Sequence, residues 1–317
     1  MKLDLIVDTS RPHDPGSISS DGRLLFSHSY QRGGYGDSDM WQSSITPIVD
    51  LNGDGIVDFA DMCVMVDHWG TDESLSDIGP MPWGDGIVDV QDLIVLYEHL
   101  FEDYRLTAHW QFDETEGSIA YDIIDVNDGI CHGEPLWQPT SGMIGGALLF
   151  DGIDDYVETP FILNPGKVSF SIFAWINGGS PGQVVVSQAD TTIDTPLGQS
   201  TNPGSMWLAT DSTDGRLMTG LMDTVFGTLD SESVVTDGQW HHVGLVYDRT
   251  ALKRHLYVDR VEVAVDSDYV AGVQTTGGLY IGAGNDLNAT TFFRGLIDDV
   301  RVYDVALSAD EIAALAQ

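Results

Sequence analysis

The sequence predicts a mainly β protein that also carries a small unit of paired loops and helices. From Leu106 onward, short apolar segments are separated by turns rich in Gly, Asn and Asp, a spacing typical of a β sandwich or jelly roll. Before that point, two loop–helix units follow one another, starting near residues 50 and 85. We therefore expect three domains: an N-terminal β segment at 1–47, a helical unit at 48–104 and a sandwich at 105–317.

The N-terminal segment reads as two strands joined by an Asp-Gly turn at residues 16–27. The continuation at 33–41 (GGYGDSDMW) resembles a repeat of TolB-type propeller blades, but only about forty residues carry the resemblance, and a propeller needs at least four blades. These strands therefore need a host sheet, supplied by the downstream domain, by a region outside this chain or by another copy. We favour another copy, which would give a calcium-dependent linear assembly, a homopolymer.

The first loop, residues 50–61, has the spacing of a calcium loop. Gly55 stands at position 6, where the chain must turn sharply, and position 7 offers a backbone carbonyl. The predicted calcium ligands are Asp50, Asn52, Asp54, Asp58 and Asp61, with the carbonyl oxygen of Ile56. The alternative is an Asp-rich surface turn whose side chains cap their own backbone.

Each loop is followed by a helical pattern. The predicted apolar faces are Phe59, Met62, Cys63, Val66 and Trp69 in the first unit, and Val90, Leu93, Ile94, Tyr97, Leu100 and Phe101 in the second. The second loop is degenerate, because Met81 and Trp83 would fall at ligand positions 1 and 3. Its predicted ligands are Asp85, Ile87, Asp89 and Asp92, with Asp77 substituting from a longer loop.

Residues 48–103 resemble a type I dockerin module, since two such units stand in tandem and the first loop ends in Asp61 rather than Glu. The resemblance implies calcium as cofactor and a cohesin-like scaffold as partner.

The C-terminal region is predicted to contain strands at 168–176, 240–248, 256–259 and 261–265. Only residues 308–315 read as a helix, with Ser308 as N-cap and Glu311 completing a capping box.

Several motifs in this region resemble the laminin-G-like, concanavalin A-like jelly roll. They are Trp110-Gln111-Phe112-Asp113-Glu114, GGALLFDG at 145–152, DDYV at 154–157, DGQWHHV at 237–243 and FRGLIDDVRVYD at 293–304. The resemblance implies one calcium held by Asp122 and Asp298, with carbonyls around Asn127 and Asp128. The alternative is that these acids cap turns.

No catalytic site is expected. Glycoside hydrolysis needs two carboxylates facing each other across a groove, and no strand offers the required spacing. Asp113, Glu114 and Glu116 come closest but occupy a structural strand-to-turn position. His241 and His242 are neighbours in a strand, so they should point to opposite faces.

Composition bounds the partners and the compartment. Fifty acidic residues against thirteen basic ones give a formal charge of −37, which disfavours binding to nucleic acid or anionic lipid. The sequence contains no stretch of eighteen apolar residues, so no membrane span is predicted. Weak calcium sites suit an extracellular or cell-surface location, although residues 1–8 form no signal peptide. Two cysteines, Cys63 and Cys131, are too few for a disulfide framework, and a disulfide between them is kept as an alternative. Cys63 is expected to be buried.

These observations favour a non-catalytic, calcium-binding extracellular protein with a structural or adhesive role, assembled into fibres or docked to a scaffold. The alternative is a carbohydrate-binding module, which would bind polysaccharide through exposed aromatics such as Trp137, Trp207 or Tyr280. A glycoside hydrolase is the third possibility.

Overall fold

The computed structural model describes residues 13–18, 24–29, 39–44, 49–80, 84–189, 191–195, 198–202, 205–221, 227–267 and 277–316. The chain divides into two compact units, residues 1–104 and residues 105–317, and each is treated by itself. The division of the first unit into a β segment and a helical unit stays a prediction.

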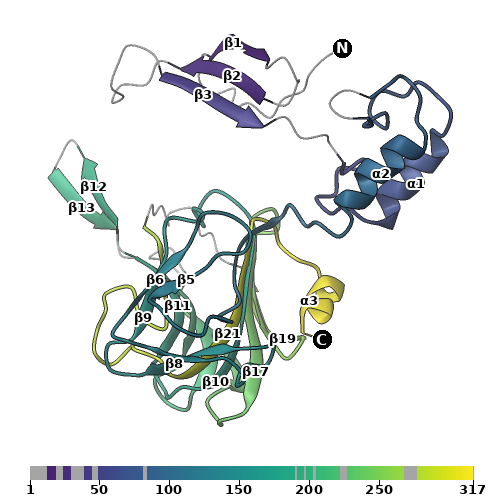
Figure 1. The fold of residues 1–317 in the computed structure, drawn as a ribbon. Helices are drawn as coiled ribbons and strands as arrows, with labels where there is room; N and C mark the ends of the chain where they lie inside the picture. Colours follow the sequence, from purple (N-terminus) through teal and green to yellow (C-terminus); the bar gives the residue numbers. More distant parts are fainter. Residues whose placement is uncertain are drawn as a thin grey trace. The chain divides into compact units, whose positions relative to one another are not determined.

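The N-terminal strands β1 (His13–Ile18), β2 (Leu24–Ser29) and β3 (Asp39–Ser44) form an antiparallel sheet in the order β1-β2-β3 (Figure 1). In the described backbone, these three strands pair with one another. The predicted Asp-Gly turn and most of the propeller-like motif lie outside the described residues. Pairing with a second copy stays a prediction.

Two short helices form the rest of the first unit, α1 (Phe59–Asp67) and α2 (Val90–Glu98). Each begins at an aspartate N-cap, Asp58 or Asp89, in a capping box that satisfies free amides of the first turn. Within this helical pair, the two loop–helix segments form backbone hydrogen bonds with each other. Val57 of the first loop bonds Phe101 and Glu102 beyond α2, and Val88 of the second loop bonds Gly70 and Thr71 beyond α1.

The core of this helical pair differs from the predicted apolar faces. Its buried members are Val49, Val57, Met65, Ile78, Val88, Val95 and Leu96, with Leu51, Met62 and Leu93 partly buried against them. The prediction was wrong for Phe59, Cys63, Val66, Trp69, Val90, Ile94, Tyr97 and Phe101, which are exposed. The physical reason is that loop residues fill much of this core, so each helix buries only a narrow stripe.

The second unit is a sandwich of two eight-stranded antiparallel sheets, as the sequence predicts (Figure 1). In spatial order, the first sheet contains β19 (Val261–Ser267), β18 (Lys253–Val258), β17 (Trp240–Asp248), β10 (Phe170–Gly178), β21 (Arg294–Tyr303), β8 (Ala147–Asp151) and β7 (Leu136–Gln138), while β4 (Leu106–Trp110) also pairs with β21. The second contains β16 (Leu229–Val234), β15 (Arg216–Thr219), β14 (Met206–Thr210), β11 (Val184–Gln188), β20 (Leu279–Ile281), β9 (Tyr156–Glu158), β6 (Gly129–His132) and β5 (Ile119–Ala120). A separate hairpin is formed by β12 (Thr191–Thr195) and β13 (Gly198–Asn202).

The main core lies between the two sheets and is rich in large aromatic side chains. Trp110, Phe150, Phe170 and Trp207 are almost fully buried there. Strand β10 is buried on both faces over most of its length, because its outer face lies beneath a second cluster. That cluster includes Phe173 and Ile312, the second of which comes from the C-terminal helix.

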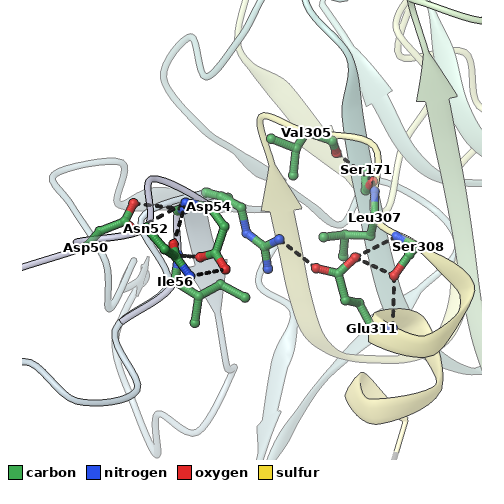
Figure 2. Close-up of polar contacts among 11 residues, drawn as sticks. Asp50, Asn52, Asp54, Ile56, Ser171, Val305, Leu307, Ser308 and Glu311 are labelled. Atoms are coloured by element: carbon green, nitrogen blue, oxygen red, sulfur yellow. Dashed lines mark hydrogen bonds and ion pairs between the residues drawn. The ribbon is translucent and has the colours of Figure 1, made fainter. Parts of the chain in front are cut away.

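The helix α3 (Ala309–Leu315) confirms the predicted C-terminal helix and its cap. The Ser308 amide donates to Glu311 Oε2 at 2.7 Å, and the Glu311 amide donates to Ser308 Oγ at 3.4 Å (Figure 2). The same glutamate forms an ion pair with Arg105, which ties α3 to the start of the sandwich. Burial of Ile312 on the outer face of the first sheet contributes about 2 kcal/mol.

Candidate functional site

The first loop wraps its side-chain oxygens around its own backbone (Figure 2). Asp50 Oδ1 accepts from the amides of Gly53 and Asp54, and its Oδ2 accepts from Gly55 at 2.9 Å. Asn52 Oδ1 accepts from the Asp54 amide at 2.9 Å, and Asp54 Oδ1 accepts from the Ile56 amide at 3.0 Å. Gly55 has a φ of +89°, a left-handed conformation that explains why a glycine stands at position 6.

The last predicted ligand of this loop, Asp61, is fully buried. Its Oδ1 accepts from the amides of Leu51 and Asn52 at 2.7 and 3.1 Å, and its Oδ2 accepts from the Asp58 amide at 2.8 Å. This carboxylate therefore fastens the beginning of the loop to the beginning of α1. Asp58 itself caps α1 through the Ala60 amide.

The second loop reproduces these contacts despite its degenerate sequence. Asp77 accepts from the amides of Asp85 and Gly86, as Asp50 does from Asp54 and Gly55, so Asp77 takes the place of the first ligand. Asp92 Oδ1 accepts from the amides of Ile78 and Gly79, and its Oδ2 accepts from Asp89, as Asp61 does in the first loop.

Two differences separate the loops. Gly79 stands where the first loop has Asn52, so the side-chain oxygen of the third ligand position is missing. Asp85 Oδ1 accepts from the Ile87 amide, but Asp85 Oδ2 is held by the Gln91 side chain at 3.0 Å. The second loop thus keeps the fold of the first with a poorer donor set for calcium.

The donor sets fit calcium in chemistry, since carboxylate, amide and carbonyl oxygens are what this cation prefers. Within the described residues, however, neither loop brings the oxygens of three carboxylates within 4.8 Å of one another. The side chains are held by backbone amides, a pattern that the capping alternative also explains. Calcium in either loop stays a prediction.

In the sandwich, Asp122 and Asp298 have different partners. Asp122 Oδ1 accepts from the amides of His109 and Ile124, and the Asn127 side chain donates to Asp122 Oδ2 at 2.9 Å. The Asn127 carbonyl accepts from the indole of Trp110. Because Asp122 and Asp298 share no hydrogen-bond partner among the described residues, a shared calcium shell stays a prediction without geometric support.

Asp298 lies instead beside Asp113 and a glycine-rich loop. It is fully buried, its Oδ2 accepts from the Ile144 amide at 2.9 Å, and its Oδ1 has no hydrogen-bond partner. Asp113 Oδ1 accepts from the Gly146 amide, and a Cβ placed on Gly142 would lie 2.8 Å from Asp298 Oδ2. Burial raises the pKa of Asp298 to about 7, and the negative charges of Asp299 and Asp113 add to the effect.

The neighbouring Asp299 is held differently, although it too is buried. Its Oδ1 meets His109 Nε2 at 2.6 Å and accepts from Arg301 at 3.0 Å. Burial alone would raise the pKa of Asp299, but these hydrogen bonds and charges outweigh it and lower the pKa. The histidine, aspartate and arginine satisfy one another inside the protein, which indicates a structural ion cluster.

The two adjacent histidines point to opposite faces of β17, as predicted. The two ring nitrogens of His241 lie within hydrogen-bonding distance of the carboxylates of Asp237 and Asp259 near the surface. His242 is buried against Phe173 and Trp175, with its ring stacked on Phe173 at 5.2 Å. Burial lowers the pKa of His242 to about 4. The pair forms no shared site.

The three aromatic residues expected to line a sugar-binding groove differ in how far they are buried. Trp207 is fully buried in the core, so its proposed exposure was wrong. Trp137 packs against the core and donates its indole N–H to the Gly117 carbonyl. Tyr280 remains partly exposed and belongs to a cluster that sequence reasoning missed.

That cluster, the aromatic patch, consists of His132, Tyr156 and Tyr280 on β6, β9 and β20. The His132 and Tyr156 rings stack at 4.5 Å, and the Tyr156 and Tyr280 rings meet edge to face at 5.3 Å. Val157, Leu279 and Ile281 point into the core, so the residues alternating with them face outward. This alternation is the signal that could have revealed the patch.

A family model decides the assignment of the sandwich. Residues 151–313 match the Laminin_G_3 model, described as the concanavalin A-like lectin/glucanases superfamily. The chain belongs to this superfamily. The expected laminin-G-like, concanavalin A-like fold is thereby confirmed, while nothing in the match concerns residues 1–104.

Solved structures show limited likeness to the chain. Domain 4 of AbnA, an extracellular arabinanase from Geobacillus stearothermophilus in complex with arabinotriose, is 22% identical with a TM-score of 0.48, over 67% of this chain and 98% of that one. The binding domain of Paraclostridial Mosquitocidal Protein 1 is 12% identical with a TM-score of 0.48, over 67% and 52%. Trypanosoma rangeli sialidase with sialic acid is 17% identical with a TM-score of 0.49, over 95% and 43%.

The chain thus spans about half or less of the last two proteins. At these identities and TM-scores the likenesses carry no functional argument. No curated protein matches the sequence. None of the described helices has the length and apolarity needed to cross a membrane.

Proposed function

We propose that this protein is a non-catalytic extracellular module that binds carbohydrate on the outer face of its second sheet. The observation that carries the proposal is the aromatic patch. Partly exposed aromatic rings stack on the apolar C–H faces of sugars, and flanking polar groups then select their hydroxyls. The membership of the chain in a superfamily of lectins and glucanases supports the same class of ligand.

The surroundings of the patch suit this chemistry. Glu158 lies directly opposite Tyr280 in the sheet and meets His132 Nε2 at 3.0 Å. Phe292 is buried and contacts Tyr156 at a ring distance of 6.3 Å, so the central ring is supported from below. The patch therefore places partly exposed aromatic rings beside a carboxylate that can accept hydrogen bonds from hydroxyls.

The test replaces both tyrosines, Tyr156→Ala and Tyr280→Ala, and measures retardation of the full chain in gels containing soluble polysaccharides such as arabinan or β-glucan. We expect the double variant to lose at least about tenfold in affinity, since ring–sugar stacking is worth about 1 kcal/mol or more per aromatic side chain. Tyr121→Ala, an exposed tyrosine outside the patch, is the matched control. Equal retardation of all three proteins would overturn the proposal.

We further propose that the helical pair binds calcium and docks the module onto a cohesin-like scaffold or another copy. Its exposed apolar residues support docking: the Phe59 and Phe101 rings meet edge to face at 6.0 Å, and Val66, Ile94 and Tyr97 are exposed nearby in sequence. Exposed apolar groups in such number favour a protein partner. The test of calcium is Asp50→Ala with Asp54→Ala, which should remove one bound calcium per chain in isothermal titration calorimetry; unchanged stoichiometry would contradict it.

We also propose that the protein has no catalytic activity on polysaccharides. Glu114 Oε1 accepts from the Tyr121 amide, and burial raises the pKa of Glu114, so this carboxylate serves a turn of the fold. We expect no release of reducing ends from polysaccharides by the purified protein. Release that disappears in Glu114→Gln or Glu116→Gln would contradict this expectation. Fibre formation through the N-terminal strands remains a prediction of the sequence.

A further inference from the structure

Three carboxylates converge at the turn between β8 and β9. Asp151 ends β8, and Asp154 and Asp155 directly precede β9. One oxygen from each lies within 4.8 Å of the other two, and no other three His, Cys, Asp or Glu side chains of the described residues meet this closely. In the sequence, these residues belong to motifs that indicate the fold.

The innermost of the three, Asp155, has an unsatisfied oxygen. Only 3% of the residue is exposed. Its Oδ2 accepts from the Asp151 amide at 2.8 Å, whereas its Oδ1 is buried without a hydrogen-bond partner. An unpaired buried carboxylate oxygen costs free energy comparable to a lost charged hydrogen bond, so it calls for a partner that the protein alone does not supply.

The space beside this oxygen is kept open by a glycine. A Cβ on Gly133 would lie 2.6 Å from Asp155 Oδ1 and 2.4 Å from the Asp154 carbonyl oxygen. Gly133 also has a φ of +84°, which favours glycine on conformational grounds. Two oxygen acceptors therefore border the position that any larger residue would fill.

Among the described residues, no basic side chain neutralises the cluster. Arg294 lies directly opposite Asp151 in the pairing of β8 with β21, yet no Arg, Lys or His among the described residues forms an ion pair with Asp151, Asp154 or Asp155. The three carboxylates therefore repel one another at close range. Mutual repulsion of this kind is relieved by a cation.

We propose that the β8–β9 turn is a binding site for a divalent cation, with Asp151, Asp154 and Asp155 as ligands and calcium as the ion that fits best. Flexible carboxylates and a carbonyl provide hard oxygen donors without the rigid octahedral geometry that magnesium demands. Asp155 directly precedes Tyr156, so the cation would brace the strand that carries the centre of the aromatic patch. The site does not depend on carbohydrate binding.

The experiment uses the full chain and terbium, a luminescent substitute for calcium that nearby tyrosines sensitise. Terbium emission and calcium stoichiometry are measured for the wild type, for Asp155→Asn and for Asp154→Asn, the second of which changes an exposed side chain and should not affect folding. Asp286→Asn, an exposed aspartate in another turn, is the control for loss of one charge. Magnesium competition separates the two hard cations.

We expect both cluster variants to lose one cation per chain, or at least about 10- to 100-fold in affinity at one site, because even outer partners of metal ligands cost that much when removed. In chelator, Asp155→Asn should melt no lower than the wild type, since it removes a buried repulsion. Magnesium should displace terbium only weakly. Stoichiometry and terbium emission equal to those of the wild type and Asp286→Asn in both variants would overturn the proposal.

Discussion

Replacing Asp61 by alanine should loosen the first calcium-type loop even when no cation is present. Its buried carboxylate accepts three backbone amides, from Leu51, Asn52 and Asp58, at 2.7, 3.1 and 2.8 Å. The change removes the acceptor of all three amides at once, at a position that is fully buried.

The size of the effect follows from these contacts. A hydrogen bond to a charged group contributes about 1.5–3 kcal/mol. The Leu51 and Asp58 amides form the two short bonds, and the longer Asn52 bond can be partly replaced by water. We therefore expect a loss of about 4 kcal/mol, which is a large share of the 5–15 kcal/mol that stabilises a typical domain.

Amide hydrogen exchange of the full chain, followed by mass spectrometry in chelator, measures this loss locally. A loss of about 4 kcal/mol corresponds to roughly a thousandfold faster exchange in peptides covering residues 49–60. Asp92→Ala is the matched variant, because Asp92 holds Ile78, Gly79 and Asp89 in the same manner in the second loop. Exchange in Asp61→Ala within about threefold of the wild type would refute the structural role of this carboxylate.

Three further outcomes are expected for the sandwich. Arg254→Met should lower the free energy of unfolding in urea by about 3–5 kcal/mol. The buried guanidinium donates to the carbonyls of Leu221 and Gly227 and pairs with Asp266. A loss below about 1 kcal/mol would contradict this prediction. The folded pKa of His242, about 4, lies below its unfolded value, so stability should fall by up to about 3 kcal/mol as the pH drops from 6.5 to 4. His242→Phe should flatten that slope, and an unchanged slope would count against it. Ser308→Ala should cost about 1 kcal/mol by removing the cap of α3, seen as a lower melting temperature.

Local patterns predicted the strands of the sandwich well. Residues 240–248 form β17 with the bounds expected from their apolar alternation, and α3 begins at the expected capping box. In the helical pair, the loops and helices lie where their spacing indicates, but the buried faces do not. Helical periodicity identifies an apolar stripe, and it says nothing about which stripe the loop residues Val57 and Val88 will cover.

The candidate sites differ in the same way: contacts within one loop can be predicted from the sequence, whereas contacts between distant strands cannot. Asp77 could be proposed from sequence because it lies in the same loop as the groups it contacts. The contact of Asp298 with the Ile144 amide, and the stacking of His132, Tyr156 and Tyr280, depend on how distant strands are registered. The pairing of β21 with β10 shifts register between Phe173 and Trp175 of β10. On β21, Asp299 lies at this shift and has a left-handed φ of +51°. Such an irregularity sets which carboxylate meets which loop, and single-sequence patterns do not reveal it.

The exchanged backbone contacts of the helical pair have a mechanical consequence. Gly55 accepts from the Tyr104 amide, and Val57 bonds both Phe101 and Glu102, so the first loop is clipped to the segment that leads into the sandwich. Because Ile56 and Asp103 form an antiparallel bridge, tension applied along the chain would load these bonds one after another, beginning with that of Gly55, before it could unwind either helix. Any change that stiffens the first loop would raise the force needed to break these bonds, so this short connection would yield before the helices do.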